Sequence, residues 1–228
     1  MNLLCGSFAV VVALMYNDLT LAFWLIVAGI VFDFFDGFVA RLLHSPSAIG
    51  VQLDSLADVI TSGLAPAAVL WQVCLQTEPC WLPETWKLGY GVFVLAAFSA
   101  LRLAKFNIDE TQTVEFCGLP TPAGSLLCAS LGMLWQQGML ALSSDGVLLI
   151  AVLTSLLLVS PIRMFALKFH GFGWRGNEVR YLFLLASIVL IIILRTYAIP
   201  VIIVLYIVVS AVRWLCMHSG NPDKAPKA

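Results

Sequence analysis

Four aspartates lie within strongly apolar stretches between residues 33 and 58. An ionisable side chain inside a membrane is costly and is usually functional. Four carboxylates within 26 residues cannot all stay charged without nearby cations. They belong to the pattern D-x-x-D-G-x-x-A-R-x8-G-x3-D-x3-D, which predicts a site for metal ions; its fixed positions are Asp33, Asp36, Gly37, Ala40, Arg41, Gly50, Asp54 and Asp58.

Helical spacing brings these acids together. Asp33 and Asp36 are three residues apart, so they share one face of a helix, and Asp54 and Asp58 are one turn apart on the next helix. The connection between the two helices is short, so we expect antiparallel neighbours whose carboxylates converge. Such oxygen ligands suit magnesium, manganese or calcium, and two divalent cations would balance four negative charges. Paired metal ions are a common means of phosphoryl transfer.

The other fixed positions favour a phosphate-containing substrate. Gly37 and Ala40 lack bulk on the face of the acids, which leaves room for a nucleotide or phosphate near the backbone. Arg41 carries a planar cationic fork suited to phosphate oxygens. A buried polar network or an ion path would also explain intramembrane acids, but eight matched positions at fixed spacing favour catalysis.

Composition places the chain in a membrane. It is 61% hydrophobic and 11% charged, with a mean hydropathy of +0.98, against about 45–50% and about 25% in soluble domains. A net charge of -1 and the lack of a long basic run give no case for nucleic-acid binding. We expect a single domain over residues 1–228, with a polar tail at 218–228.

The apolar segments predict an all-α integral membrane protein with about eight transmembrane helices. A spanning helix needs about 20 apolar residues. A tight turn near Pro200 separates the last two segments, which leaves seven or eight as the range. The predicted spans are about 2–16, 20–42, 51–76, 87–107, 122–142, 146–168, 179–196 and 198–217.

The distribution of basic residues predicts the orientation. Cytoplasmic connections carry an excess of Lys and Arg. Of the 12 basic residues, only Lys87 and Arg195 fall on the side opposite to the other ten. We therefore expect a multi-pass protein of the cytoplasmic membrane, with both termini and the active site facing the cytoplasm. The remaining ten are Arg41, Arg102, Lys105, Arg163, Lys168, Arg175, Arg180, Arg213, Lys224 and Lys227.

The stretch VFDFFDGFVARLLHSPSAIGVQLDSLAD, from Val31 to Asp58, resembles the signature of the CDP-alcohol phosphatidyltransferase family. The resemblance implies a six-helix core, here followed by two C-terminal spans, and displacement of CMP from a CDP-linked lipid by an alcohol. It also implies two bound divalent metals and suggests a homodimer. By motif position, the metal ligands would be Asp33, Asp36, Asp54 and Asp58, with Asp58 also the base that deprotonates the alcohol. Contacts to the CDP-linked lipid would come from Asp33, Gly37, Ala40, Arg41 and Ser47.

A second segment points to the acceptor. Residues 116–123 resemble the F-x-G-L-P-x-P-A segment of membrane-embedded bacterial phosphatidylserine synthases, a branch of this family. Serine is a zwitterion, so its site needs a cation for the carboxylate and an acceptor for the ammonium group. The positive-inside rule alone would also explain the basic residues among the candidates. The candidate serine-binding residues are Arg102, Lys105, Asn107, Glu115 and Arg163.

Two alternatives and two details stay open. Another acceptor, glycerol 3-phosphate or an inositol phosphate, would use the same chemistry but would need a denser basic cluster. An ion-coupled transporter would need repeated halves with broken helices, and the sequence shows no such repeat.

Cys74 and Cys80 could pair if their loop faces an oxidising compartment. The residues that contact the cytidine remain unassigned.

Overall fold

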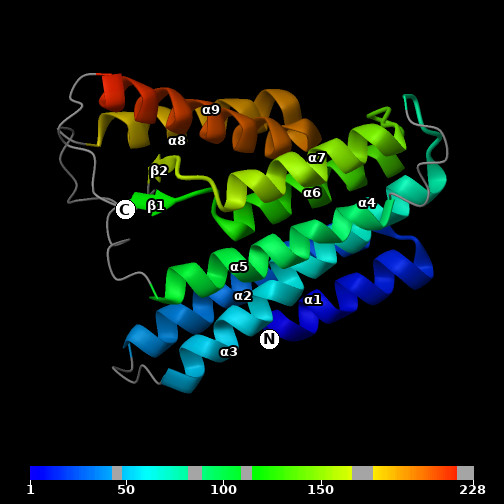
Figure 1. Cartoon of the computed structure of the whole chain (residues 1–228), viewed down its shortest axis with the longest axis horizontal. Helices are drawn as coiled ribbons and strands as arrows, with labels where there is room; N and C mark the ends of the chain where they lie inside the picture. Colours follow the sequence, from blue (N-terminus) through cyan, green and yellow to red (C-terminus); the bar gives the residue numbers. More distant parts are fainter. Residues whose placement is uncertain (43–47, 82–88, 109–114, 166–176, 220–228) are drawn as a thin grey trace.

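The computed structural model describes residues 1–42, 48–81, 89–108, 115–165 and 177–219, which form a bundle of helices lying roughly along one direction (Figure 1). Two short strands, β1 (Glu115–Cys117) and β2 (Arg163–Phe165), lie at one end of the bundle. The α-helices are α1 (Asn2–Val11), α2 (Leu19–Leu42), α3 (Ala48–Asp58), α4 (Ala65–Gln76), α5 (Val94–Ile108), α6 (Thr121–Gln136), α7 (Ser144–Leu158), α8 (Glu178–Leu194) and α9 (Ala198–Ser219).

Several of these helices are long enough to cross a membrane. Among the described residues, four apolar segments meet this requirement: Leu19–Val39, Ile49–Gln76, Gly89–Ile108 and Glu178–Cys216. The last covers 39 residues and contains both α8 and α9, which pack against each other after a turn at Arg195. The prediction of a helical membrane protein is confirmed. The count of eight spans is not confirmed and stays a prediction.

The structure departs from the prediction after α7. The predicted span at 146–168 ends as a helix at Leu158, because Pro161 disfavours the helical conformation in the residue before it. The chain then forms β2, which pairs with β1 in antiparallel register, Cys117 opposite Arg163 and Glu115 opposite Phe165. The pairing satisfies backbone groups that would otherwise lack partners between the helices. The predicted all-α fold did not include this pair of strands.

The helices pack in layers around an apolar core. Figure 1 shows α8 and α9 along one side of the bundle and α1 and α3 along the opposite side, with α6 and α7 next to the C-terminal pair. Helix α6 contacts both α2 and α9, and so links the two sides. Its Gly132 lies directly against Val69 of α4, where a Cβ atom would overlap the Val69 side chain. Small residues of this kind let membrane helices approach closely.

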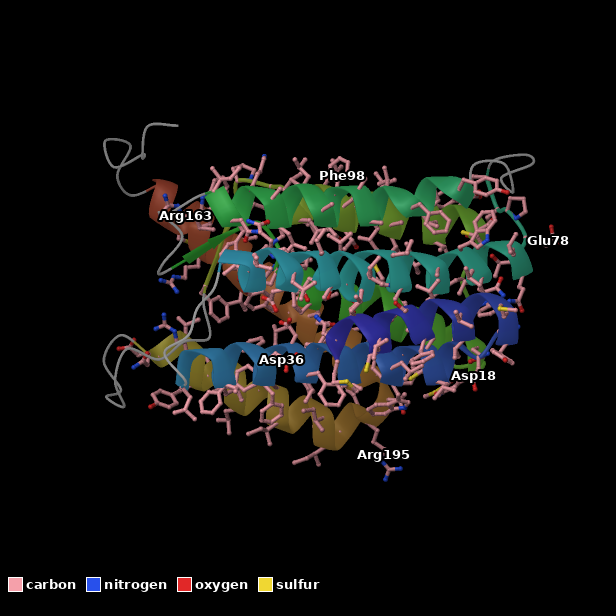
Figure 2. All side chains as sticks on the ribbon, turned by 90° about the horizontal axis from the view of Figure 1, so that it is seen from below. Asp18, Asp36, Glu78, Phe98, Arg163 and Arg195 are labelled. Carbon is pink, nitrogen blue, oxygen red and sulfur yellow. The ribbon has the colours of Figure 1, made fainter. Side chains whose placement is uncertain are left out.

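The end of the bundle that carries Asp18 and Glu78 lies opposite the end that carries Arg163 (Figure 2). At the Asp18 end, the segment that follows α4 is held by Asp145. The carboxylate of Asp145 accepts hydrogen bonds from the backbone N–H groups of Cys80 at 2.7 Å and Trp81 at 2.6 Å. Cys80 is exposed, while Cys74 is buried within α4, and both thiols are free. The two cysteines therefore do not form a disulfide in this structure.

Candidate active site

The acids of the motif come from two neighbouring helices. Asp33 and Asp36 lie on α2, and Asp54 and Asp58 lie on α3. Asp33 and Asp58 are half-buried, whereas Asp54 and Asp36 are exposed, Asp36 with 60% of its side chain accessible. Asp33 lies close enough to Asp54 and to Asp58 for their charges to interact. The predicted convergence is therefore present for three of the four acids, with Asp36 one turn farther along α2.

Asn2, a residue outside the motif, joins these acids. Its side-chain amide donates to Oδ1 of Asp33 at 3.1 Å and to Oδ1 of Asp58 at 2.9 Å. Asn2 is 4% exposed, so the two hydrogen bonds are largely shielded from water. The sequence motif did not reveal Asn2, because this residue lies 31 and 56 residues from its partners. A polar residue at the start of an apolar helix was the signal of its role.

Close packing of α1 against Thr61 positions Asn2. The hydroxyl of Thr61 donates to the backbone oxygen of Asn2 at 3.1 Å. A Cβ at Gly6 would lie 2.8 Å from Thr61 Cα, and a Cβ at Gly29 would lie 2.6 Å from Thr61 Cγ2. Any larger residue at either glycine would force the helices apart. The two glycines thus set the distance between Asn2 and the carboxylates.

The helix that carries Asp58 changes its winding immediately after it. Residues Val59–Leu64 form a π-helical segment between α3 and α4. Such segments are rare and occur frequently at functional sites. The wider turn places Thr61, Ser62 and Gly63 in the interior directly behind Asp58. The signal in the sequence is weak, since Thr-Ser-Gly within an apolar run indicates only close packing.

The donor chemistry of this site fits divalent cations. The charged carboxylates of Asp33, Asp54 and Asp58 repel one another, and a bound cation would offset this repulsion. Carboxylate oxygens are the ligands that magnesium, manganese and calcium prefer. Over the described parts of the chain, no three acidic, histidine or cysteine side chains are clustered tightly enough to enclose an ion on their own. Further ligands would have to come from water or from substrate oxygens, as is usual for magnesium.

The remaining motif residues lie around the connection between α2 and α3. At Gly37 a Cβ atom would meet no described atom within 4 Å, so this face of α2 borders open space. Ala40 and Arg41 lie in the last turn of α2, and Gly50 lies exposed in the first turn of α3. Ser47 lies outside the described residues.

Arg102 of α5 lies beside the carboxylates. The guanidinium is close enough to Asp58 for the charges to interact, and its Nη1 donates to Oγ1 of Thr121 at 2.8 Å. It also lies 5.8 Å from the centre of the Phe106 ring. Arg102 is only 8% exposed, and its Nε is buried without a hydrogen-bond partner in the described part of the protein. A buried guanidinium with a spare donor is well suited to bind an anion.

A cavity of about 420 Å³ opens next to Arg102. Arg102 and Lys105 supply its positive charge, and the strand β1 and the end of α7 form the opposite wall. A second cavity, of about 450 Å³, lies at the Asp18 end of the bundle and is lined by Asn17, Gln76 and Gln136 but by no ionisable residue. The first cavity is therefore the candidate substrate site; its lining residues are Arg102, Lys105, Phe106, Ile108, Cys117, Leu158, Val159, Ser160 and Pro161.

The other predicted serine-site residues are spread around this end of the bundle. Asn107 donates to the hydroxyl of Ser55 at 2.9 Å, so it contacts α3 between Asp54 and Asp58. Glu115 lies in β1 and the exposed Arg163 lies in β2. Arg102 and Lys105 line the cavity, whereas Asn107 and Arg163 are not among the described residues that line it.

The G-L-P-x-P segment shapes the wall of the cavity. Gly118 has a φ of +76°, and a Cβ there would lie 2.9 Å from the carbonyl carbon of Leu158. The N–H groups of Gly118 and Leu119 donate to the carbonyl oxygens of Ile162 and Leu157, both at 2.9 Å. This fixed turn starts α6 at Thr121, the residue that binds Arg102. The G-L-P-x-P segment thus positions Thr121, the hydrogen-bond partner of Arg102.

Comparison with known proteins agrees with this geometry. A protein of Bacillus subtilis named CDP-diacylglycerol–serine O-phosphatidyltransferase is 33% identical over 170 residues, covering 75% of this chain and 88% of the relative. Proteins with the same name from Helicobacter pylori and Mycobacterium tuberculosis are 31% and 35% identical over 200 and 220 residues. These matches cover 86% and 89% of this chain, and 80% and 73% of the respective relatives. The family model for CDP-alcohol phosphatidyltransferase matches residues 1–162, which contain the four motif aspartates, Arg102 and Lys105, and the chain belongs to this family.

Proposed function

We propose that this protein transfers the phosphatidyl group of CDP-diacylglycerol to the hydroxyl of L-serine, giving phosphatidylserine and CMP. The observation that carries the proposal is the position of Arg102, a buried cation beside Asp58 that borders a cavity of about 420 Å³. In this proposal Arg102 would bind an anion next to the carboxylates of the family motif. The relatives named as serine transferases support the choice of acceptor.

The carboxylates would hold two divalent cations. Asp33, Asp36, Asp54 and Asp58 offer oxygen ligands from α2 and α3, and magnesium or manganese is the expected metal, with calcium a further candidate. When bound, two such ions would neutralise the charge of the diphosphate and of the departing CMP. Asn2 would keep Asp33 and Asp58 in place for this role.

CDP-diacylglycerol would bind along the end of α2. Asp33, Gly37, Ala40 and Arg41 follow one another along this helix, and the open space beside Gly37 would admit the diphosphate. Arg41 would bind phosphate oxygens through its planar guanidinium. Ser47 follows in the connection to α3 and completes the proposed set.

Serine would bind between α5 and the strand pair. We assign its carboxylate to Arg102 and Lys105, which line the cavity. Asn107 contacts α3 beside the acids, where it would orient the serine hydroxyl. Glu115 in β1 would accept the ammonium group, and Arg163 in β2 would add positive charge at the entrance.

Asp58 would act as the general base. It takes the proton of the serine hydroxyl while that oxygen attacks the lipid-side phosphorus, and the bond from this phosphorus to the oxygen of CMP breaks. The electrons of that bond leave with CMP, and the proton stays on the Asp58 carboxyl group until it is released to water. Asp58 is half-buried and shares a hydrogen-bond donor with Asp33, so it can serve both the metal and the acceptor.

An acceptor panel tests this function. Purified protein, CDP-diacylglycerol and magnesium or manganese are incubated with L-serine, glycerol 3-phosphate or an inositol phosphate, and the lipids are identified by mass spectrometry. The expected product is phosphatidylserine with serine alone, in equal amount to the CMP released. The Asp33→Asn variant serves as the inactive control. Formation of a phosphatidylglycerophosphate or an inositol lipid instead would show that the acceptor is wrong.

We further propose that the single domain of residues 1–228 lies in the cytoplasmic membrane as a homodimer with both termini in the cytoplasm. The positive-inside distribution supports the orientation, since only Lys87 and Arg195 oppose it. A cysteine introduced near Asn221 should resist an impermeant thiol reagent in intact cells and react after lysis. Labelling in intact cells would show that the orientation is the opposite one. A monomer in native mass spectrometry from mild detergent would contradict the proposed dimer.

A further inference from the structure

The helix pair α8 and α9 lies beyond residues 1–162, the part that matches the family model. Within the structure this pair is not separate from the core. Helix α9 packs against α6 and against β2, and Figure 1 shows both strands between the C-terminal pair and the rest of the bundle. The pair therefore contacts β2, which pairs with β1 in the wall of the cavity beside Arg102.

An aromatic cluster makes this contact specific. Tyr206 of α9 lies with its ring centre 4.9 Å from that of Phe165 in β2 and 5.8 Å from that of Phe183 in α8. Its hydroxyl donates to the backbone oxygen of Phe165 at 3.0 Å. Tyr206 is 7% exposed, so this hydrogen bond is buried. Because Phe165 pairs with Glu115 of β1, the hydroxyl anchors the strand pair to α9.

The strand pair is linked in turn to Arg102. Gly118, the residue after β1, donates its N–H to the carbonyl oxygen of Ile162, the residue before β2, and the same turn leads into α6, where Thr121 accepts a hydrogen bond from Arg102. An arginine side chain has many rotamers and loses much of that freedom when it is fixed. By anchoring β2, the hydroxyl of Tyr206 would stabilise the turn that carries Thr121 and so the position of the guanidinium, with Nε left for a ligand.

We propose that Tyr206 is a positioning residue for Arg102, so that the C-terminal helix pair completes the binding site for the acceptor's carboxylate. This inference rests on the proposed function, in which Arg102 binds that carboxylate. Tyr206 itself does not touch the substrate: it holds the strand pair through Phe165 and limits the movement of Arg102.

The test compares two tyrosines of the same helix pair. Tyr206→Phe keeps the ring but removes the hydroxyl. Tyr197→Phe is the matched control, because its hydroxyl also donates to a backbone oxygen, that of Met139 at 2.7 Å, at the turn between α8 and α9. Losing one buried hydrogen bond changes an equilibrium constant by about three- to tenfold. We expect Tyr206→Phe to raise the KM for serine by that factor, with kcat at saturating serine and the KM for CDP-diacylglycerol unchanged, and Tyr197→Phe to change none of the three.

A second measurement separates positioning from folding. Ethanolamine is serine without the carboxylate, and its inhibition constant against serine transfer is measured for each variant. Tyr206→Phe should weaken serine binding but leave ethanolamine inhibition unchanged, because only serine uses Arg102. A ratio of constants does not depend on the fraction of folded enzyme. Three results would overturn the inference: an unchanged KM for serine, equal weakening of serine and ethanolamine, or a raised KM for CDP-diacylglycerol in place of serine. Absence of serine transfer by the unsubstituted protein would instead refute the proposed function.

Discussion

Replacement of Asn2 by alanine should reduce catalysis with little effect on stability. Asn2 donates to Asp33 and to Asp58, and a hydrogen bond to a charged group contributes about 1.5–3 kcal/mol. Loss of one such contribution in the transition state corresponds to about 10- to 150-fold in rate. Water can replace part of the second bond, so we expect kcat/KM to fall by about 10- to 100-fold.

The effect of Asn2→Ala on stability depends on a different atom of Asn2, its side-chain oxygen. Oδ1 of Asn2 is buried and has no hydrogen-bond partner in the described residues. An unsatisfied buried acceptor costs about 1–3 kcal/mol, and Asn2→Ala removes this cost together with the two bonds. We therefore expect the melting temperature to change little, although the activity falls.

Initial rates of CMP release and thermal unfolding in detergent measure the two quantities. Ser7→Ala is the control on the same helix, since the Ser7 hydroxyl makes only a local bond to the Leu3 carbonyl oxygen on the exposed face of α1. Its activity should stay within about twofold, as is usual for surface changes. Asn2→Asp should be no more active than Asn2→Ala, because it adds a third carboxylate beside Asp33 and Asp58.

Two results would refute this account of Asn2. Full activity of Asn2→Ala would show that the bonds to Asp33 and Asp58 do not matter for turnover. Activity of Asn2→Asp close to that of the unsubstituted protein would show that the residue acts through an oxygen, as a metal ligand would, and not as a donor.

The remaining predictions concern the acids and the turn before α6. Asp36→Ala should lower activity by orders of magnitude even at saturating metal, because an oxygen ligand is lost from the proposed paired site; near-normal turnover would contradict this assignment. Asp58→Asn should still bind CDP-diacylglycerol in an equilibrium binding assay while turnover falls by about 10²–10⁴-fold, the usual contribution of a positioned base; unchanged turnover would require another base. Gly118→Ala should lower the free energy of unfolding by more than Gly138→Ala, since both have positive φ, which costs about 1–2 kcal/mol, but only Gly118 lies against the backbone of Leu158. Equal melting temperatures for the two variants would refute that argument.

The part of the candidate site that could be predicted from sequence lies within short stretches of chain. Asp33 and Asp36 share a face because three residues make nearly one helical turn, and the same periodicity aligns Asp54 with Asp58. A short connection keeps the acid-bearing parts of α2 and α3 near each other, although both helices pack against α1. Apolar runs likewise predicted the long membrane helices, because a bilayer requires continuous hydrogen-bonded and apolar segments.

Features that depend on distant parts of the chain were decided by the tertiary structure. The contact of Asn2 with Asp58 spans 56 residues and depends on Gly6, Gly29 and Thr61 packing at one point. The end of α7 at Leu158 was predicted ten residues too late, at 168, because its apolar run continues while the chain turns into β2. No local periodicity encodes either feature.

The surroundings of Arg102 show the same division most clearly. The sequence by itself determined that a cation precedes the G-L-P-x-P segment, but its position also fitted a role in membrane orientation alone. Only the packed structure brings Thr121 of α6 and Asp58 of α3 to its guanidinium. Helical periodicity relates residues a few positions apart, whereas a buried charge needs partners from several helices, and which helices meet is decided by how their surfaces fit together.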